Sequence, residues 1–338
     1  MSTSAAAVAQ GERRQTDIVA LLGRLAPLIF LLALVIAMSF VSPGFRDPKN
    51  LLQVVRTQSF VGILAVGMTF VILTAGIDLS VGSLVAFAGL VCASAARGSR
   101  DLLMGVTDPG GVHVLYGFLA AIGVGLAIGL LQGVLIGNLG LPAFIVTLGG
   151  FGAWRGAALV WSGGQPISGF SDDFKFWGQG YIGPAPVPVV IFFLLVVIAH
   201  IVLRYTQYGR WIYAIGGNLE ASRLSGLPVK ALIVSVYVIT GLCSGLSAFL
   251  LTSRLGSAEQ RAGVNYELLA IAGVVIGGTS LFGGQGGVLG TLVGVLLIGV
   301  LNNALVILNV PTDFQPIIIG AIIVLSVYLD NVAKQRRR

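Results

Sequence analysis

The stretch TQSFVGILAVGMTFVILTAGIDLSVGSLVAFAGLVCASAA, residues 57–96, carries one charged side chain in 40 positions, Asp78. A membrane-spanning helix needs about 20 predominantly apolar residues, so this stretch is long enough to cross a bilayer twice. A carboxylate at the centre of a bilayer costs roughly 2.5–3.5 kcal/mol on insertion scales. We therefore expect Asp78 either at a turn between two spans or at a functional site.

The rest of the chain has the same character. Of its 338 residues, 56% are hydrophobic and 10% are charged, against about 25% charged in soluble domains. The 48 glycines suit helices whose backbones approach closely in a membrane. This composition argues against a soluble enzyme. The net charge of +7 comes from the termini and the loops, which is typical of membrane topology and does not indicate a nucleic-acid partner.

Runs without charge predict an all-α polytopic membrane protein with about ten transmembrane helices. The expected spans cover residues 25–41, 58–75, 83–96, 115–137, 142–161, 188–204, 231–252, 267–282, 287–308 and 314–330. The third is short, and the last is marginal by length. Residues 25–330 therefore form one transmembrane domain, between a polar tail at 1–24 and a basic tail at 331–338.

The distribution of Lys and Arg predicts the orientation. Ten spans place both termini on one side, where 11 Lys and Arg residues fall against 8 on the other side. By the positive-inside rule, the N- and C-termini are then cytoplasmic. The loop at 205–230 also lies in the cytoplasm, and the loop at 162–187 lies outside.

Two segments show weak similarity to each other. Residues 64–84 resemble residues 269–289, with Thr74 and Thr279 in register. Many transporters contain duplicated halves, but glycine- and leucine-rich helices also resemble one another by chance. The sequence leaves both explanations open.

The loop at 205–230 contains the segment NLEASRLSGLP, residues 218–228. Asn218 is a favourable N-cap, and Glu220 falls in the first turn, where the helix dipole favours an acid. Gly226 is suited to the left-handed stop conformation, and the proline that follows prevents the helix from resuming. We predict a helix of about two turns, which is either a simple connector or a rigid element that fits a cytoplasmic partner.

Short motifs shared with one known family occur in order along the chain. They are GIDLSVG at residues 76–82, Arg155-Gly156, GQPI at 164–167, AGVVIGGTS at 272–280 and GVLNN at 299–303. They resemble signatures of the ribose/xylose-type sugar permease family of ATP-binding-cassette importers. The resemblance covers about residues 25–330, and several independent motifs make it specific.

The same resemblance includes the cytoplasmic loop. Glu220-Ala221 followed by Gly226 looks like the shortened Glu-Ala-Ala…Gly loop of such permeases, although Ser222 replaces the second alanine. At that size we expect the helix to survive the replacement. The resemblance implies that the loop couples the chain to a separate ATPase subunit. The implied coupling residues are Leu219, Glu220, Ala221, Arg223 and Gly226.

Two charged residues, one between predicted spans and one inside a span, have alternative roles. Asp78, near two glycines, either caps the start of the third span or belongs to a gate of the transport pathway. Arg155 lies about 20 Å along its helix from Pro142. It either snorkels or bonds to a loop near the outer face, or it lines an outer vestibule.

Uncharged polar residues in the apolar runs also have two interpretations. A sugar needs hydrogen-bonding groups along its path, but such groups also bond helices to one another, at about 0.6 kcal/mol per contact. The pathway candidates are Asn138, Thr147, Asn302 and Asn303. In the outer loop, Asp172 and Asp173 are candidates for docking a substrate-delivering protein, against a simple lid on the bundle.

The resemblance implies a permease subunit in a bacterial inner membrane that carries a pentose, hexose or related polyol by alternating access. Its implied partners are a cytoplasmic ATP-binding subunit, an extracytoplasmic sugar-binding protein, a second permease copy (most simply as a homodimer), the sugar and membrane lipid. Gly-x-x-x-x-Gly-Lys-Ser/Thr is absent from the chain, so we expect no catalysis, cofactor or metal here, with ATP and magnesium in the partner. One alternative is an ion-coupled secondary sugar transporter. Another is an integral membrane enzyme, which is disfavoured because the sequence shows no convergent set of catalytic residues.

Overall fold

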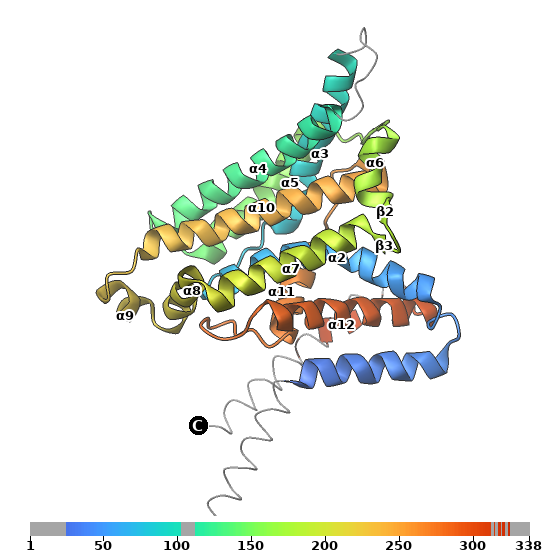
Figure 1. Ribbon diagram of the computed structural model, residues 1–338. Helices are drawn as coiled ribbons and strands as arrows, with labels where there is room; N and C mark the ends of the chain where they lie inside the picture. Colours follow the sequence, from blue (N-terminus) through green and yellow to red (C-terminus); the bar gives the residue numbers. More distant parts are fainter. Residues whose placement is uncertain are drawn as a thin grey trace, which may run out of the picture.

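The computed structural model describes residues 25–102 and 112–311, with residues 314, 317, 318, 320, 321 and 324. It is built almost entirely of helices (Figure 1). After the helix Leu25–Val41, they are α2 (Pro48–Leu73), α3 (Val81–Leu102), α4 (Val112–Gly137), α5 (Ala143–Ser162), α6 (Asp172–Gln179), α7 (Val187–Tyr205), α8 (Gln207–Gly217), α9 (Leu219–Leu224), α10 (Val229–Leu255), α11 (Tyr266–Ile276) and α12 (Val288–Ile307). The predicted tails at 1–24 and 331–338, and most of the tenth span, lie outside the described residues.

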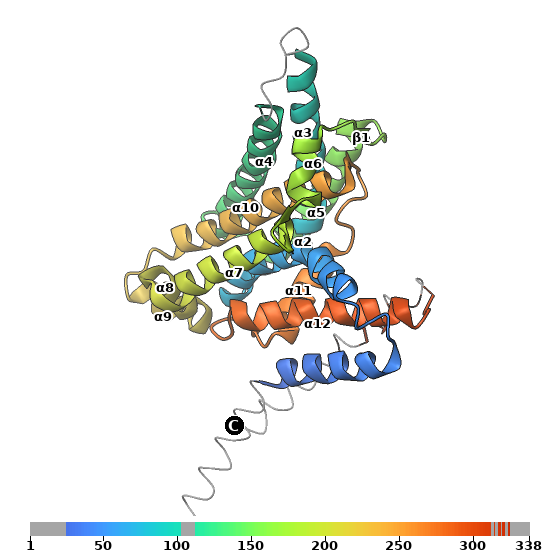
Figure 2. The same ribbon diagram turned by 45° about the vertical axis from the view of Figure 1, so that its right-hand side comes forward.

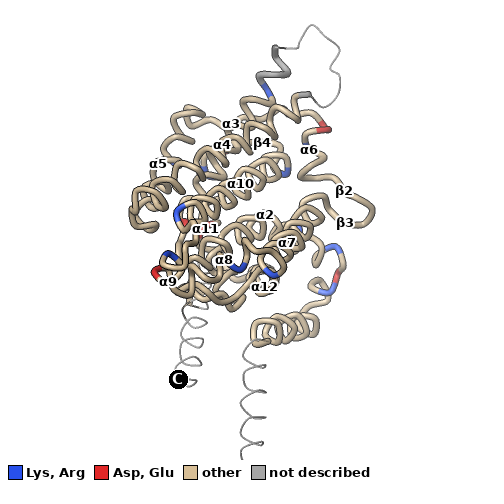
Figure 3. The backbone as a smooth tube through the Cα atoms, turned by 60° about the vertical axis from the view of Figure 1, so that its left-hand side comes forward, with Lys and Arg blue, Asp and Glu red and all other residues tan. Residues whose placement is uncertain are grey.

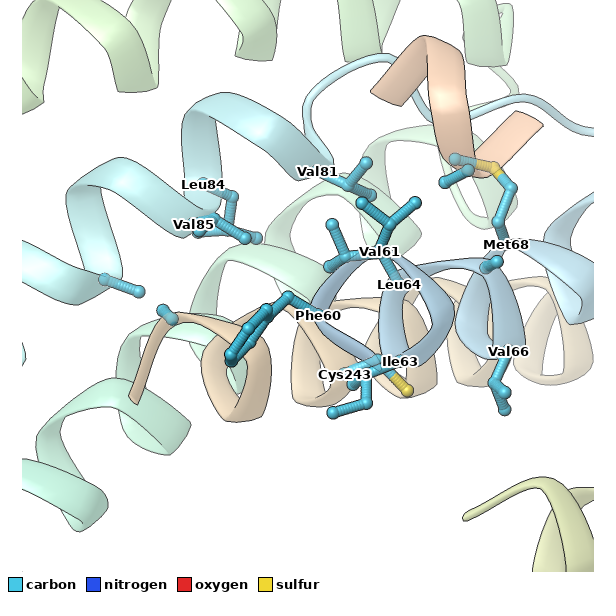
Figure 4. Packing of buried hydrophobic residues seen from close by; sticks show 14 of the residues in the cluster. Phe60, Val61, Ile63, Leu64, Val66, Met68, Val81, Leu84, Val85 and Cys243 are labelled. Atoms are coloured by element: carbon cyan, nitrogen blue, oxygen red, sulfur yellow. The ribbon is translucent and has the colours of Figure 1, made fainter. Parts of the chain in front are cut away.

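Helix α2 forms the centre of the bundle. In its most apolar 18-residue stretch 89% of the residues are buried, against 17% in α5. Such burial follows from a helix that is apolar on every side. Figure 4 shows Ile63 and Leu64 of α2 packed with Val81 of α3 and Cys243 of α10.

Helices α4 and α10 are joined along a seam of glycines. Gly125 and Gly129 on α4 face Gly241 on α10, and a β-carbon at Gly125 or Gly241 would collide with the carbonyl of the other. Gly245 lies against the Ala121 carbonyl in the same way. Spacing of small residues by four places them on one helix face and lets two backbones touch, as is common in membrane bundles.

The first described helix lies beside α12, as Figures 1 and 2 both show. Leu31 and Met38 are buried in a small cluster with Leu297 and Val300 of α12. Phe45, in the connection to α2, completes this cluster and is fully buried. The N-terminal helix is thus part of the packed bundle.

Short strands and a helix cover the end of the bundle opposite α9 (Figure 1). Strand β1 (Ile167–Ser168) pairs antiparallel with β4 (Ser257–Ala258), with Ile167 opposite Ala258. Strands β2 (Tyr181–Ile182) and β3 (Ala185–Pro186) form a hairpin after α6, with Tyr181 opposite Pro186. The predicted loop at 162–187 therefore contains regular secondary structure and caps this end of the bundle.

The described part of the chain has six helices long and apolar enough to cross a membrane: α2, α4, α5, α7, α10 and α12. Three shorter apolar helices are Leu25–Val41, Val81–Arg97 and Tyr266–Ile276. The all-α membrane architecture is confirmed, but two predicted boundaries are wrong. Helix α2 begins ten residues before the predicted start at residue 58, because Asp47 accepts the Lys49 backbone N–H and Pro48 favours a first turn.

The second wrong boundary is that of the predicted span 267–282. Helix α11 ends at Ile276, and Gly278 follows with a φ of +88°. A left-handed residue ends the helix, and glycine adopts it without a side-chain penalty. This hydrophobic segment is thus a short helix followed by a glycine-rich loop, and not one continuous helix over its predicted length.

Candidate functional site

The helix predicted in the 205–230 loop is present as α9, Leu219–Leu224. The Asn218 side chain accepts the Ala221 backbone N–H at 2.8 Å, and Glu220 lies in the first turn. Gly226 follows with a φ of +79°. The predicted start and stop of this helix are confirmed.

One face of α9 lies against the protein and the other faces solvent. Ser222 is 5% exposed, whereas Leu219 is 51% and Leu224 is 81% exposed. The departure from the family motif therefore falls on the inward face, where a small side chain is needed. Glu220, Ala221 and the other predicted coupling residues, Arg223 and Gly226, are all exposed.

Helix α9 follows α8 directly, and α8 was not predicted. Thr206 caps it by accepting the Gly209 backbone N–H at 3.2 Å. The Tyr208 and Ser235 hydroxyls are 2.7 Å apart, which ties α8 to α10. Tyr213 donates to the Gly286 carbonyl at 2.9 Å, which ties α8 to the loop before α12.

Both tyrosines serve as neutral hydrogen-bonding groups. Burial raises the pKa of Tyr208, and the bond to Ser235 lowers it by a smaller amount. Burial likewise raises the pKa of Tyr213, partly offset by nearby Arg204. Because a phenol ordinarily titrates near pH 10, these links persist at any physiological pH.

The end of α8 touches two other elements through backbone atoms. A β-carbon on Gly216 would collide with the Leu73 carbonyl at the end of α2 and with the backbone nitrogen of Gly284. The Gly284 N–H also donates to the Leu73 carbonyl at 3.0 Å. We call this contact of Leu73, Gly216 and Gly284 the glycine junction. The contact is made by backbone atoms, with no side chain between α8, the end of α2 and Gly284.

Asp78 lies in the bend between α2 and α3, residues 74–80, and is 2% exposed. Its Oδ1 accepts the Ser80 backbone N–H at 2.8 Å and the Ser80 hydroxyl at 2.7 Å. The Gln132 amide donates to the Ser80 hydroxyl at 2.8 Å. Asp78 therefore fixes Ser80, the residue directly before α3, and its two predicted roles, cap and gate, both stay predictions.

The bend is set back from the ends of the neighbouring helices. A β-carbon at Gly76 would stand 2.7 Å from the Tyr237 hydroxyl, and Tyr237 is eight residues into α10, about 12 Å at 1.5 Å per residue. Among the described residues the Tyr237 hydroxyl has no hydrogen-bond partner. Neither the depth of the bend nor the position of Tyr237 beside it was predicted from the sequence.

Thr147 and Arg155, both on α5, have different surroundings. The Thr147 hydroxyl lies 3.3 Å from the Ile77 carbonyl and 2.9 Å from the Ala143 carbonyl, so Thr147 is beside the Asp78 bend. Arg155 donates to the carbonyls of Gln260 and Ala262 at 2.7 and 2.9 Å. The helix-to-loop bond that the sequence analysis allowed for Arg155 is therefore formed.

The asparagines are not gathered at the Asp78 bend. Asn303 and Asn50 exchange amide hydrogen bonds at 2.9 and 3.0 Å, which joins α12 to α2. Asn302 is half-buried beside Asn303. Asn138 is exposed at the end of α4, in a shallow groove that Lys230 also lines. Asn303 thus bonds one helix to another, which was the second of its two predicted interpretations.

The two acidic residues of the cap formed by α6 and its neighbouring strands are also separated. Asp172 forms an ion pair with Lys175 at 3.4 Å and is fully exposed. Asp173 lines a cavity between α6 and the ends of α4, α7 and α10. Both lie in the first turn of α6, where the helix dipole stabilises an acidic side chain.

Two buried charges were missed as site residues. Arg56 directly precedes the 57–96 stretch, and it is buried within α2 and donates to the Gly178 carbonyl at 2.9 Å. Glu267 on α11 is 5% exposed, and a β-carbon at Gly82 would collide with its carboxylate. Arg155 is its electrostatic neighbour. The position of each charged residue next to a long apolar run was the one feature of the sequence that could have indicated its burial.

A bundle whose described part has six helices long and apolar enough to cross a membrane is typical of a polytopic membrane protein. The sequence profile of a permease family, described as the permease component of branched-chain amino acid transport systems, matches residues 50–327. The chain belongs to this family.

Several named permeases are similar to the chain over nearly their whole length. A ribose import permease of Haemophilus influenzae is 43% identical over 307 residues, which is 90% of this chain and 91% of that protein. A D-allose transport system permease of Escherichia coli is 39% identical over 306 residues, 90% of each. A xylose transport system permease of Haemophilus influenzae is 31% identical over 373 aligned positions, 91% of this chain and 96% of that protein. No solved structure matches the chain significantly.

Proposed function

We propose that this chain is the membrane-spanning permease subunit of an ATP-binding-cassette importer for a monosaccharide, a pentose, hexose or related polyol, in a bacterial inner membrane. The observation that carries the proposal is α9, which is capped at both ends and presents exposed Leu219 and Leu224 to solvent. Relatives named for ribose, allose and xylose transport support the substrate class. ATP hydrolysis then takes place in separate subunits that bind α9.

The proposed topology has ten spans with both termini in the cytoplasm. The contacts support an alternating arrangement, because the ends of α2, α8 and the start of α12 meet at the α9 side. Figure 3 shows charged residues gathered in loops and at helix ends, with the long helices mostly uncharged. Cysteine labelling from outside cells tests the topology: a cysteine at Lys175 reacts, and one at Arg223 reacts only after permeabilisation. Labelling of Arg223→Cys in intact cells would contradict the orientation.

The proposed coupling route runs from α9 through α8 to the glycine junction. Helix α9 follows α8 after a single residue, and Gly216 of α8 touches the Leu73 carbonyl of α2. Asp78 lies five residues beyond Leu73 and starts α3. Movement of an ATPase against α9 is thereby delivered to the α2–α3 bend, next to Thr147. We assign the gate to this bend, with Asp78 holding its shape.

A second copy of the chain completes the proposed permease. Helix α5 is apolar, yet only 17% of its span is buried. Thr147 and Arg155 lie on this helix. A partner copy that covers α5 would leave the sugar pathway between the two copies. On the outer side, Asp172 with its neighbouring loops remains the proposed docking point for a sugar-binding protein.

Reconstitution tests the function. The purified chain is placed in vesicles with and without its ATPase and binding protein, and uptake of ribose, allose, arabinose and xylose is measured. Uptake that needs ATP and both partners supports the importer. Uptake by the chain alone under an ion gradient would establish the secondary transporter instead, and Asp78 would then be its first candidate for ion coupling.

Charge reversal on α9 tests the coupling role. Glu220→Lys places a positive charge beside the helix N-terminus, where the dipole disfavours it, and Gly226→Pro blocks the observed φ of +79°. We expect both variants to insert in the membrane but to lose co-purification with the ATPase and transport at least tenfold. Glu259→Lys, an exposed reversal at the opposite end, is the matched control. Unchanged ATPase binding and transport in both α9 variants would contradict the coupling role.

A further inference from the structure

An apolar cavity lies at the end of the bundle opposite α9. It has a volume of about 650 Å³ and is formed where α6 crosses the ends of α4, α7 and α10. This volume falls within the range of about 300–1,000 Å³ typical of small-molecule sites. The transport pathway assigned above does not use it, since α5 contributes no residue to its lining.

The lining of this cavity is hydrocarbon with one exception. Phe118 of α4, Ile191 of α7 and Leu246 of α10 form its walls, and Phe176 and Trp177 of α6 form its rim. The single charged lining residue is Asp173. A sugar needs several hydrogen-bonding groups around it, which this lining does not supply.

Asp173 is directed to the cavity by the helical period of α6. Asp173, Phe176 and Trp177 are spaced i, i+3, i+4 and therefore share a helix face. Asp172 and Lys175 lie on another face, where they pair with each other at 3.4 Å. Among the described residues Asp173 has no ion-pair partner, so one carboxylate without an ion pair lies at the mouth of the cavity.

The surroundings decide what fills the cavity. Leu115, Phe176 and Trp177 on its rim are 53%, 46% and 40% exposed. Trp is typical of the membrane–water interface, so the rim opens where lipid headgroups meet acyl chains. Because apolar cavities do not hold water, the acyl chain of a neighbouring lipid is the available occupant.

From this geometry we propose that the cavity binds a phospholipid with an amine headgroup, phosphatidylethanolamine, with an acyl chain in the cavity and the ammonium group on Asp173. The negative charge of Asp173 favours a cationic group at the mouth and disfavours a headgroup with net negative charge, such as phosphatidylglycerol. The ammonium group also has N–H donors for the carboxylate.

Native mass spectrometry of the purified chain, with lipid added after delipidation, tests the headgroup. We expect the wild type to bind phosphatidylethanolamine about threefold more tightly than phosphatidylglycerol, the scale of one partly exposed ionic contact. Asp173→Asn removes this preference. Asp172→Asn, one residue away but outside the cavity, retains it. Equal binding of the two lipids by the wild type, or loss of preference in both variants, overturns the headgroup assignment.

A pair of cavity variants tests the acyl-chain site. Leu246→Trp fills the cavity and is expected to lower binding of either lipid at least fivefold. Leu242→Trp, one turn away on α10 and 38% exposed, leaves the cavity open and retains binding. Thermal unfolding of both variants shows that the fold is intact. Lipid binding by Leu246→Trp at the wild-type level overturns the site, and neither result depends on sugar transport.

Discussion

The chain contains two helix–break–helix units, and they are built in opposite ways. In the first, α2 and α3 are joined by the buried bend at 74–80, whose shape is held by the Asp78 side chain. In the second, α11 and α12 are joined by residues 277–287, which contain six glycines. Gly278, Gly283, Gly284 and Gly286 all have positive φ. One break is fixed by a side-chain network and the other by backbone conformation.

The difference follows from the environment of each break. The first bend is enclosed by α4, α5 and α10, so its polar groups must find partners within the protein. The second faces outward, with Phe282 at 87% exposure, and must fit closely against α8 instead. Side chains would prevent the close contact between loop 277–287 and α8, so glycines occupy the contact positions. The two breaks then touch each other directly at the glycine junction.

The largest effect is expected in the glycine-built break. In Gly286→Ala the new β-carbon would meet Thr279 within van der Waals radii at a φ of +117°. Overpacking of this kind costs about 1–3 kcal/mol, in addition to roughly 1–2 kcal/mol for the left-handed backbone. Gly278→Ala, at a φ of +88° with open space around it, has only the second cost. Thermal unfolding in detergent compares them, and equal midpoints would show that loop 277–287 is not held against its neighbours.

A smaller effect is expected in the side-chain-built break. Asp78→Ala removes the acceptor of the Ser80 N–H and hydroxyl and costs about 1–3 kcal/mol. Asp78→Asn retains an acceptor oxygen and is expected to lose less than half of that. Hydrogen exchange of the peptide covering the start of α3 should speed up in the alanine variant alone. Unchanged exchange in Asp78→Ala would remove the capping role and leave the gate as its sole assignment.

The smallest effect concerns the bond between the two units. The hydroxyls of Thr69 on α2 and Thr291 on α12 are 2.8 Å apart and buried. A double-mutant cycle with Thr69→Val and Thr291→Val should give a coupling of about 0.6 kcal/mol, the average for hydrogen bonds between membrane helices. Strict additivity of the two single variants would indicate that the units are not joined through this contact.

The sequence predicted those parts of the structure that depend on local chemistry. The cap at Asn218 and the stop at Gly226 act within one short segment, so α9 was found with nearly correct bounds. Asp78 was placed at a turn because Ser80 and the flanking glycines are close in sequence. The ends of most spans were set by where apolar runs end, which is also a local property.

What the sequence did not show depends on contacts between distant segments. Arg56 is buried because the Gly178 carbonyl, 122 residues away, accepts its hydrogen bond. The glycine junction joins residues that are more than 60 positions apart, and a single chain gives no signal for such a meeting. Helix α11 was predicted too long because apolar residues continue beyond it, although Gly277 and Gly278 were a local warning. The roles of Asn303 and Asn138 likewise required knowledge of which helices are neighbours.

The glycine seam between α4 and α10 has a consequence for the electrical seal of the membrane. A file of water molecules needs about 10–15 Å³ of free space for each molecule, and at Gly125 and Gly241 the two backbones leave no room even for a methyl group. Protons therefore have no hydrated track between these helices. A protein that changes shape to transport a sugar must not let protons leak across the membrane. At this seam the leak is prevented by direct backbone contact, which the absence of side chains allows.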